Sequence, residues 1–165
     1  MTAFEAFFGF TGSPFSRYIS VSHLLETESS RELQGRLNYV ARTRAFGVFT
    51  GDAGTGKTAI LEWCQEHTPG KSILIRGSAT YAQIVKDIVT EWELDAEGAK
   101  LPDYEKAILS ETGHAIYVDD LHKAQPKLLA LLKILAERHK ICGSILAGIK
   151  TKEELKQLLW GMETI

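Results

Sequence analysis

Short apolar runs alternate with longer amphipathic stretches along most of this chain. Four runs are rich in β-branched, aliphatic and aromatic residues and are short enough to be strands. The stretches between them repeat their apolar positions every three or four residues, which is the period of a helix with one buried face. The pattern therefore predicts strands that alternate with helices. We expect the strands at residues 46–50, 72–77, 115–120 and 143–148.

The helices are predicted from the periodic stretches and from residues that favour helix ends. Thr80 is a suitable N-cap, Pro126 suits a first helical turn, and Thr151 with Glu154 forms a capping box. Strands that alternate with helices predict an α/β fold with a mostly parallel sheet. We expect helices at residues 30–44, 56–66, 81–92, 103–111, 126–139 and 151–160.

The length of 165 residues and the 44% hydrophobic content are typical of one globular domain, which we expect at residues 30–165. Residues 1–29 contain many aromatic residues, Gly and Ser, and are expected to form an irregular lead-in. That lead-in has no basic region of the signal-peptide type, and no apolar run approaches the roughly 20 residues of a membrane span. We therefore expect a cytoplasmic protein without a membrane segment. The cysteines, Cys64 and Cys142, lie in apolar runs and are expected to be buried free thiols.

The segment between the first strand and the helix after it matches GxxxxGK[ST] at every fixed position. Glycines let backbone N–H groups approach phosphate oxygens closely, and the N-terminus of the following helix favours the same anion. Lys57 is expected to reach the β- and γ-phosphates and to act in catalysis, and Thr58 to ligate Mg²⁺. The sequence thus predicts a nucleotide-binding site. The expected nucleotide-binding residues are Gly51, Asp52, Ala53, Gly54, Thr55, Gly56, Lys57, Thr58 and Ala59.

Two adjacent carboxylates, Asp119 and Asp120, end the third apolar run. This pattern suits the metal side of a phosphoryl-transfer site. We expect Asp119 to hold Mg²⁺ through water and Asp120 to orient and polarise the attacking water as a catalytic residue. The nearby His122 has two interpretations, a sensor of the γ-phosphate or a simply solvated side chain.

The net charge of the chain is −2, but its charged residues are unevenly distributed along the sequence. Residues 87–120 hold ten acidic and two basic residues, whereas residues 121–160 hold three acidic and eight basic ones. Separated charges favour head-to-tail contacts between copies or an anionic partner on one face. Ordinary solvated helix faces explain the same distribution.

With these motifs in place, the chain resembles the AAA+ ATPases, which have a three-layer P-loop NTPase fold. Within them it is most similar to the bacterial transposition-helper group, the TniB, IstB and MuB types, which is related to the ExeA secretion ATPase. The resemblance rests on the opening FFGFTGSPFSR, on the stretch RELQGRLNYVARTRAFGVFTGDAGTGKTAILE, and on YVDDLHKAQPKLLALLKIL. Together these cover most of residues 7–148.

The resemblance implies an ATP-dependent oligomer, assembled head to tail, that binds duplex DNA and recruits or stimulates a transposase. It also implies that residues near 10–15 lie over the adenine. Three departures from the group are visible: Asp120 stands where Glu is usual, Ile149 occupies the usually polar sensor position, and the residues after Trp160 supply no fifth strand and no helical lid. The resemblance therefore predicts a short form of the group.

Several assignments stay open at the level of sequence. Arg138 is either an arginine finger or a residue that complements a helix dipole, and Lys150 is either a phosphate ligand or solvated. The strand at 46–50 is expected to be a sheet edge. Three explanations stay open: residues 17–23 cover it, a partner covers it, or the chain is a naturally short or truncated form. For function, the alternatives are a non-catalytic ATP-binding interaction module and an ExeA-like secretion ATPase.

Overall fold

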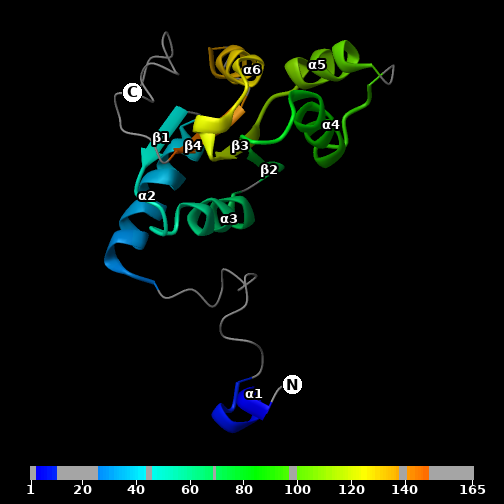
Figure 1. Ribbon diagram of the computed structural model, residues 1–165. Helices are drawn as coiled ribbons and strands as arrows, with labels where there is room; N and C mark the ends of the chain where they lie inside the picture. The colour runs from blue at the N-terminus through cyan, green and yellow to red at the C-terminus, as the bar shows by residue number, and fades with distance from the viewer. Residues whose placement is uncertain are drawn as a thin grey trace.

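The computed structural model describes residues 3–10, 26–43, 46–68, 70–96, 100–137 and 141–148. Helices and strands alternate through these ranges, as the sequence predicts (Figure 1). The helices are α1 (Ala3–Phe8), α2 (Glu28–Arg42), α3 (Lys57–His67), α4 (Tyr81–Glu91), α5 (Leu101–Ser110), the 3₁₀ turn η2 (Leu121–Lys123) and α6 (Pro126–Glu137). The strands are β1 (Phe46–Thr50), β2 (Ser72–Arg76), β3 (His114–Asp119) and β4 (Ile141–Gly148).

The four strands form one parallel sheet in the order β1-β4-β3-β2. The predicted parallel sheet is confirmed, and the order places β4 between β1 and β3. Parallel strands all end at the same edge, so the segments after β1 and β3 emerge on the same side with one strand between them. This arrangement brings the Gly-rich segment and the paired carboxylates together.

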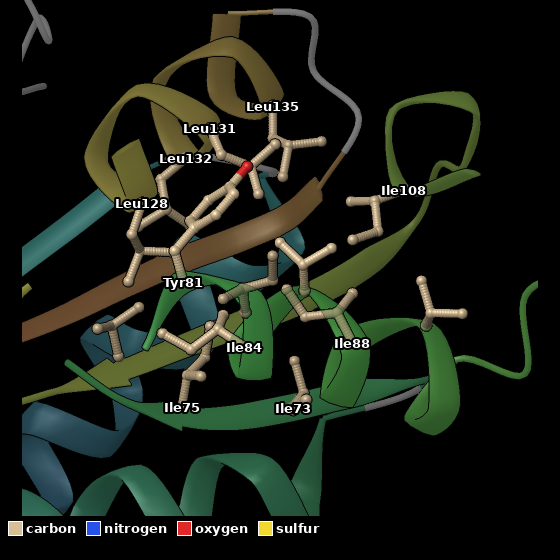
Figure 2. Close-up of a cluster of buried hydrophobic side chains, with 14 of the residues drawn as sticks. Ile73, Ile75, Tyr81, Ile84, Ile88, Ile108, Leu128, Leu131, Leu132 and Leu135 are labelled. Carbon is tan, nitrogen blue, oxygen red and sulfur yellow. The ribbon is translucent and has the colours of Figure 1, made fainter. Parts of the chain in front are cut away.

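Helices cover both faces of the sheet, which gives the predicted three layers (Figure 1). Alternate residues of β3 point into the two cores, because side chains alternate along a strand. Ile116 and Val118 pack with α4, α5 and α6, whereas Ala115 and Tyr117 pack with α2 and α3. Figure 2 shows the larger cluster, in which isoleucines of β2 and α4 face the leucines of α6.

Local capping accounts for the helix starts. Thr27 and Ser30 form a reciprocal capping box at the start of α2, and the Thr80 side chain accepts a hydrogen bond from Gln83 N at the start of α4. The capping box moves the start of α2 to Glu28, two residues before the predicted position. The expected irregular lead-in also contains the short helix α1, which carries exposed Phe7 and Phe8.

Some sequence expectations lie outside the described residues: the last helix at 151–160, Arg138, Ile149, Lys150 and the segment 17–23. Within the described part of the chain, β1 pairs with β4 alone and is an edge strand, as expected. Cys64 is a buried free thiol, and burial raises its pKa to about 12. No described helix is long and apolar enough to cross a bilayer.

Candidate functional site

The Gly-rich segment forms a tight loop between β1 and α3. Gly54 and Gly56 have φ angles of +81° and +84°, in the left-handed region that glycine adopts without a steric penalty. Thr55 closes the loop, since its Oγ1 donates a hydrogen bond to Asp52 O at 2.8 Å. Gly51 lies so close to this hydroxyl that an added Cβ would meet Thr55 Oγ1 at 2.9 Å. The motif glycines thus fit the backbone path that a phosphate cradle requires.

The Lys57 ammonium lies inside this loop. Its Nζ donates hydrogen bonds to Gly51 O at 2.7 Å and to Asp52 O at 2.6 Å. The side chain therefore folds back across the loop from the first turn of α3. A phosphate entering the loop would offer charged oxygens in place of these carbonyls, and charge-assisted hydrogen bonds are the stronger kind.

The loop contacts the carboxyl end of β3 through Thr58 and Asp119. Thr58 Oγ1 donates a hydrogen bond to Asp119 Oδ2 at 2.6 Å, and Asp120 N donates to Asp119 Oδ1 at 2.9 Å. Asp119 is the one charged residue that is buried among the described residues, with 6% of its surface exposed. Both of its oxygens have partners, which is what keeps a buried carboxylate stable.

Asp120 lies at a sharp turn of the chain directly after β3. Its φ of +51° is left-handed, a conformation that Asp tolerates better than most residues. Its Oδ2 accepts a hydrogen bond from Lys123 Nζ at 2.7 Å. That hydrogen bond, aided by the charges of Lys123, His122 and Arg76, holds the pKa of Asp120 below its usual value against the opposing effect of burial. Asp120 is thus a partly exposed, ionised carboxylate.

Gly77, which follows β2, supports this turn and was missed by sequence reasoning. Its N–H donates a hydrogen bond to Asp119 O at 2.8 Å, and an added Cβ would lie 2.5 Å from Asp120 O. A glycine after a strand carries no signal for this in the sequence, because the contact is made by a residue about forty positions away. Only the pairing of β2 with β3 reveals it.

A cavity of about 1030 Å³ opens beside the loop, between α2 and α3. Its wall includes Gly51, Gly54, Thr55, Gly56, Lys57 and Ala59 of the predicted set, and also Gln34, Trp63 and His67, which were not predicted. The lining of this cavity does not include Thr58, Asp119 or Asp120. The two carboxylates therefore lie on a different side of the loop from the cavity. The volume is at the upper end for small-molecule sites.

The comparisons with known proteins agree with this geometry. The family model described as AAA domain matches residues 40–158, which is most of the chain. The chain belongs to the AAA domain family. No curated protein matches the sequence at a significant level.

Solved structures share the fold of this AAA domain. A chain of the Drosophila ORC bound to AT-rich DNA and Cdc6 is 19% identical, with a TM-score of 0.57 over 82% of this chain and 50% of that one. A chain of Drosophila ORC bound to DNA is 16% identical, with a TM-score of 0.56 and 82% of each chain covered.

A variant of RuvB from Thermotoga maritima is 15% identical to the AAA domain, with a TM-score of 0.51 over 88% of this chain and 44% of that one. The chain thus spans half the length of the first ORC chain and less than half of RuvB. Identities this low show the fold alone. That fold is the α/β P-loop NTPase fold of AAA+ type, and the chain is an ATP-binding AAA+ domain of that fold.

The residues beside the phosphate loop are suited to a magnesium ion that takes few of its ligands from the protein. Among the described residues, no group of three or more His, Cys, Asp or Glu side chains is arranged to hold a metal. The AAA domain instead offers two oxygens, the Thr58 hydroxyl and the buried Asp119 carboxylate, already within hydrogen-bond distance. Mg²⁺ suits such a site because it keeps several waters and takes other ligands from phosphates.

The His122 side chain is not simply solvated, which was one of the two interpretations of this residue. It is half-buried, and its Nδ1 is buried without a hydrogen-bond partner among the described residues. Its charge is one of the influences that lower the pKa of Asp120. Whether it senses a phosphate stays a prediction.

Proposed function

We propose that this AAA domain binds ATP with Mg²⁺ and hydrolyses it slowly, with turnover that rises when copies assemble. The hydrogen bond between Thr58 and Asp119 carries this proposal. It joins the phosphate loop to the end of β3, so that one ion could contact the hydroxyl, the water held by the carboxylate, and the phosphates together. Magnesium would supply neutralisation of the developing phosphate charge.

The other predicted site residues divide the remaining tasks. Gly51, Gly54 and Gly56 let backbone N–H groups surround the phosphates, and Lys57 exchanges its carbonyl partners for the β- and γ-phosphates. Asp119 would hold the magnesium ion through water. Asp120 has a different partner from Asp119 and is partly exposed, which suits a group that polarises the attacking water.

The test is ATP hydrolysis by the pure protein, measured beside ATP affinity on the same sample, with and without duplex DNA. We expect turnover per subunit to increase with protein concentration, because the resemblance to the AAA+ ATPases implies head-to-tail assembly with ATP between the subunits. A protein that binds no ATP in the presence of Mg²⁺ would overturn the proposal.

We further propose that the assembled protein binds duplex DNA and recruits or stimulates a transposase. Support comes from the resemblance to transposition helpers, from the ORC structures that contain DNA, and from the basic stretch at 121–160. Basic residues of α2 are paired with carboxylates, Arg31 with Glu26 at 3.8 Å and Arg36 with Glu32 at 2.5 Å. Exposed pairs of this kind are weak, so phosphates could replace the carboxylates.

DNA binding is tested by fluorescence anisotropy with a labelled duplex, with and without ATP, at several salt concentrations. We expect ATP to raise the affinity and salt to weaken it steeply, since phosphate contacts release counterions. Affinity that is independent of both ATP and salt would contradict the DNA proposal and leave the ATP proposal intact.

A second candidate function, a non-catalytic ATP-binding interaction module, is favoured by one observation. Lys123 Nζ donates a hydrogen bond to Asp120 Oδ2 at 2.7 Å. This pairing engages the carboxylate that would otherwise polarise the attacking water. Lys123→Met separates the two candidates. If the pair blocks an otherwise competent site, the variant hydrolyses ATP faster than the wild type. Tight ATP binding with no turnover in either protein, under any condition, would favour the interaction module.

A further inference from the structure

We propose that the solvent-facing side of α2 is the surface that contacts the phosphates of duplex DNA, whatever the base sequence. This inference rests on the proposed DNA binding and adds the residues that make the contacts. We call this surface the outer face of α2. Its members are Arg31, Gly35, Asn38, Tyr39 and Arg42, with Arg36 at its border.

The outer face is one continuous strip of the helix surface. Residues three or four positions apart are neighbours on an α-helix. The members that follow one another at these intervals are Arg31, Gly35, Tyr39 and Arg42. Asn38 precedes Arg42 by four positions and so borders the same strip. All of these residues are exposed in the structure.

The other side of α2 packs against the body of the domain. Leu37 is buried, and Leu33 and Val40 pack against the same core cluster, which includes residues of α3. Leu33 and Gln34 also line the cavity beside the phosphate loop, whereas no member of the outer face does. DNA contacts on the outer face can therefore be removed without removing a residue that lines the nucleotide cavity.

Tyr39 marks the outer face as a contact surface. Its exposed fraction is 68%, whereas Ile134, the other exposed large apolar side chain among the described residues from 26 onward, has 37%. Arg36 and Arg42 lie three positions before and after Tyr39, so two cations flank the ring on the helix surface. Arginine, asparagine and tyrosine side chains are all among those that contact the phosphates and sugars of DNA.

The charge of this half of the helix also suits a phosphate backbone. Residues 33–44 hold three arginines and no acidic residue. Within the described part of the chain, no carboxylate pairs with Arg42, so its guanidinium is available to an anion. Arg31 and Arg36 each pair with a glutamate, but these side chains are 63–75% exposed, and such pairs contribute little. A phosphate, which arginine can bind through two N–H groups, can replace the glutamates.

Gly35 lets another backbone approach the helix closely. Glycine inside a helix lowers stability relative to alanine. The fold does not require it here, because an added Cβ would meet no atom within 4 Å and the φ angle is not positive. The missing side chain leaves room on the exposed strip for a sugar–phosphate backbone, which accounts for a glycine at this position.

The first test is fluorescence anisotropy with a labelled duplex at saturating ATP and Mg²⁺. Each lost phosphate contact lowers the salt slope by about 0.9, so Arg42→Ala should bind about 8-fold more weakly at 0.1 M salt and about 3-fold more weakly at 0.3 M. The loss should be the same for two duplexes of unrelated sequence. Lys86→Ala is a matched control that removes an exposed cation from α4, on the other face of the sheet (Figure 1), and should leave the salt slope unchanged.

Gly35→Ala separates DNA contact from a role in folding. Alanine should raise the melting temperature, because it favours the helix. The same substitution should weaken duplex binding severalfold, because the methyl group holds the DNA backbone away from the helix. A purely structural role for Gly35 does not produce a more stable protein that binds DNA less well. Duplex affinity equal to that of the wild type would overturn the close approach at Gly35.

Tyr39→Phe tests whether a phosphate or a base contacts the ring, because it removes only the hydroxyl. We expect severalfold weaker duplex binding, since the hydroxyl is the group that contacts a phosphate. Stacking of an unpaired base would instead tolerate phenylalanine and favour a single strand. Tighter binding to a single strand of the same sequence, with no effect of Tyr39→Phe, would overturn the duplex assignment.

The outcomes also distinguish this inference from the proposed function. If the wild type binds no duplex in the presence of ATP and Mg²⁺, the proposed DNA binding itself fails. If the wild type binds and Arg42→Ala keeps its affinity and salt slope, the outer face is not the DNA surface, and the proposed DNA binding stands. ATP titration of each variant should match the wild type, because these residues do not line the nucleotide cavity. Parallel loss of ATP and DNA affinity would overturn the outer face as a separate surface.

Discussion

Thr58 and Asp119 lie 61 positions apart, yet the Thr58 hydroxyl donates a hydrogen bond to the Asp119 carboxylate at 2.6 Å. The sheet produces this contact, because β1 and β3 flank β4 and all three strands end at one edge. The phosphate loop and the carboxylates are therefore parts of one site.

Replacing Lys57 by Ala is expected to abolish ATP binding. The variant loses the ammonium that reaches Gly51 O and Asp52 O in the loop and that would contact the phosphates. Isothermal titration with ATP and Mg²⁺ measures the effect. Lys133→Ala is a matched control, since the one ion pair of Lys133 among the described residues is with Glu137 on α6. Unchanged affinity in Lys57→Ala would refute the central assignment.

Replacing Thr58 by Val should weaken ATP binding only when Mg²⁺ is present. Valine keeps the shape of threonine but removes the hydroxyl, and it leaves a buried Asp119 oxygen without its partner. The lost partner should also lower the free energy of unfolding by about 1–3 kcal/mol. Titrations in Mg²⁺ and in EDTA check the first expectation, and chemical denaturation checks the second. Equal weakening in EDTA would argue against a metal role for Thr58.

Asp120→Asn should leave ATP affinity within about twofold of the wild-type value and remove hydrolysis. Asparagine has nearly the same size but cannot polarise water as a carboxylate does. Steady-state phosphate release, measured beside ATP titration, tests the expectation. Turnover equal to that of the wild type would remove Asp120 from the catalytic role.

The pair of Asp120 and Lys123 predicts a pH-dependent difference in stability. Lys123 lowers the pKa of Asp120 in the folded protein, so the pair stabilises the fold at pH values above the ordinary pKa of an aspartate. That contribution disappears as pH falls through the lowered pKa and the carboxylate becomes protonated.

Denaturation of the wild type and of Lys123→Met from pH 7 to pH 3 measures this contribution. The advantage of the wild type should be largest near neutral pH and should shrink toward pH 3. Lys123→Arg, which keeps the charge, should behave like the wild type. An advantage that grows on acidification would have the wrong sign for this pair.

Two glycine substitutions should have opposite effects on stability. Gly77→Ala brings a Cβ to 2.5 Å from Asp120 O, so the turn that carries both carboxylates must shift. We expect a loss of about 1–3 kcal/mol. Gly35, inside α2, has no atom within 4 Å of an added Cβ, so Gly35→Ala should stabilise the protein by about 0.5–1 kcal/mol. Thermal unfolding of both variants, with ATP titration of Gly77→Ala, tests the pair.

The sequence by itself determined most of the helices and strands, the parallel sheet and the phosphate loop. These are local properties of the sequence. The period of the hydrophobic positions decides between strand and helix, and capping residues decide where a helix ends. Glycine is required where the φ angle is positive, as at Gly54 and Gly56. The pair at Asp119 and Asp120 was visible for the same reason, as two acids directly after an apolar strand. The short helix α1 was missed, since residues 3–8 are aromatic and lack a strong helical signal.

Tertiary structure alone decided which distant residues meet. Strand order places Gly77 against Asp120 and Thr58 against Asp119, and the packing of α2 beside α3 puts Gln34 and Trp63 in one cavity. The pairing of Lys123 with Asp120 depends on the left-handed turn after β3, which a sequence pattern does not encode. Contacts of this kind depend on how elements pack, and packing minimises the free energy of the whole chain rather than of any segment.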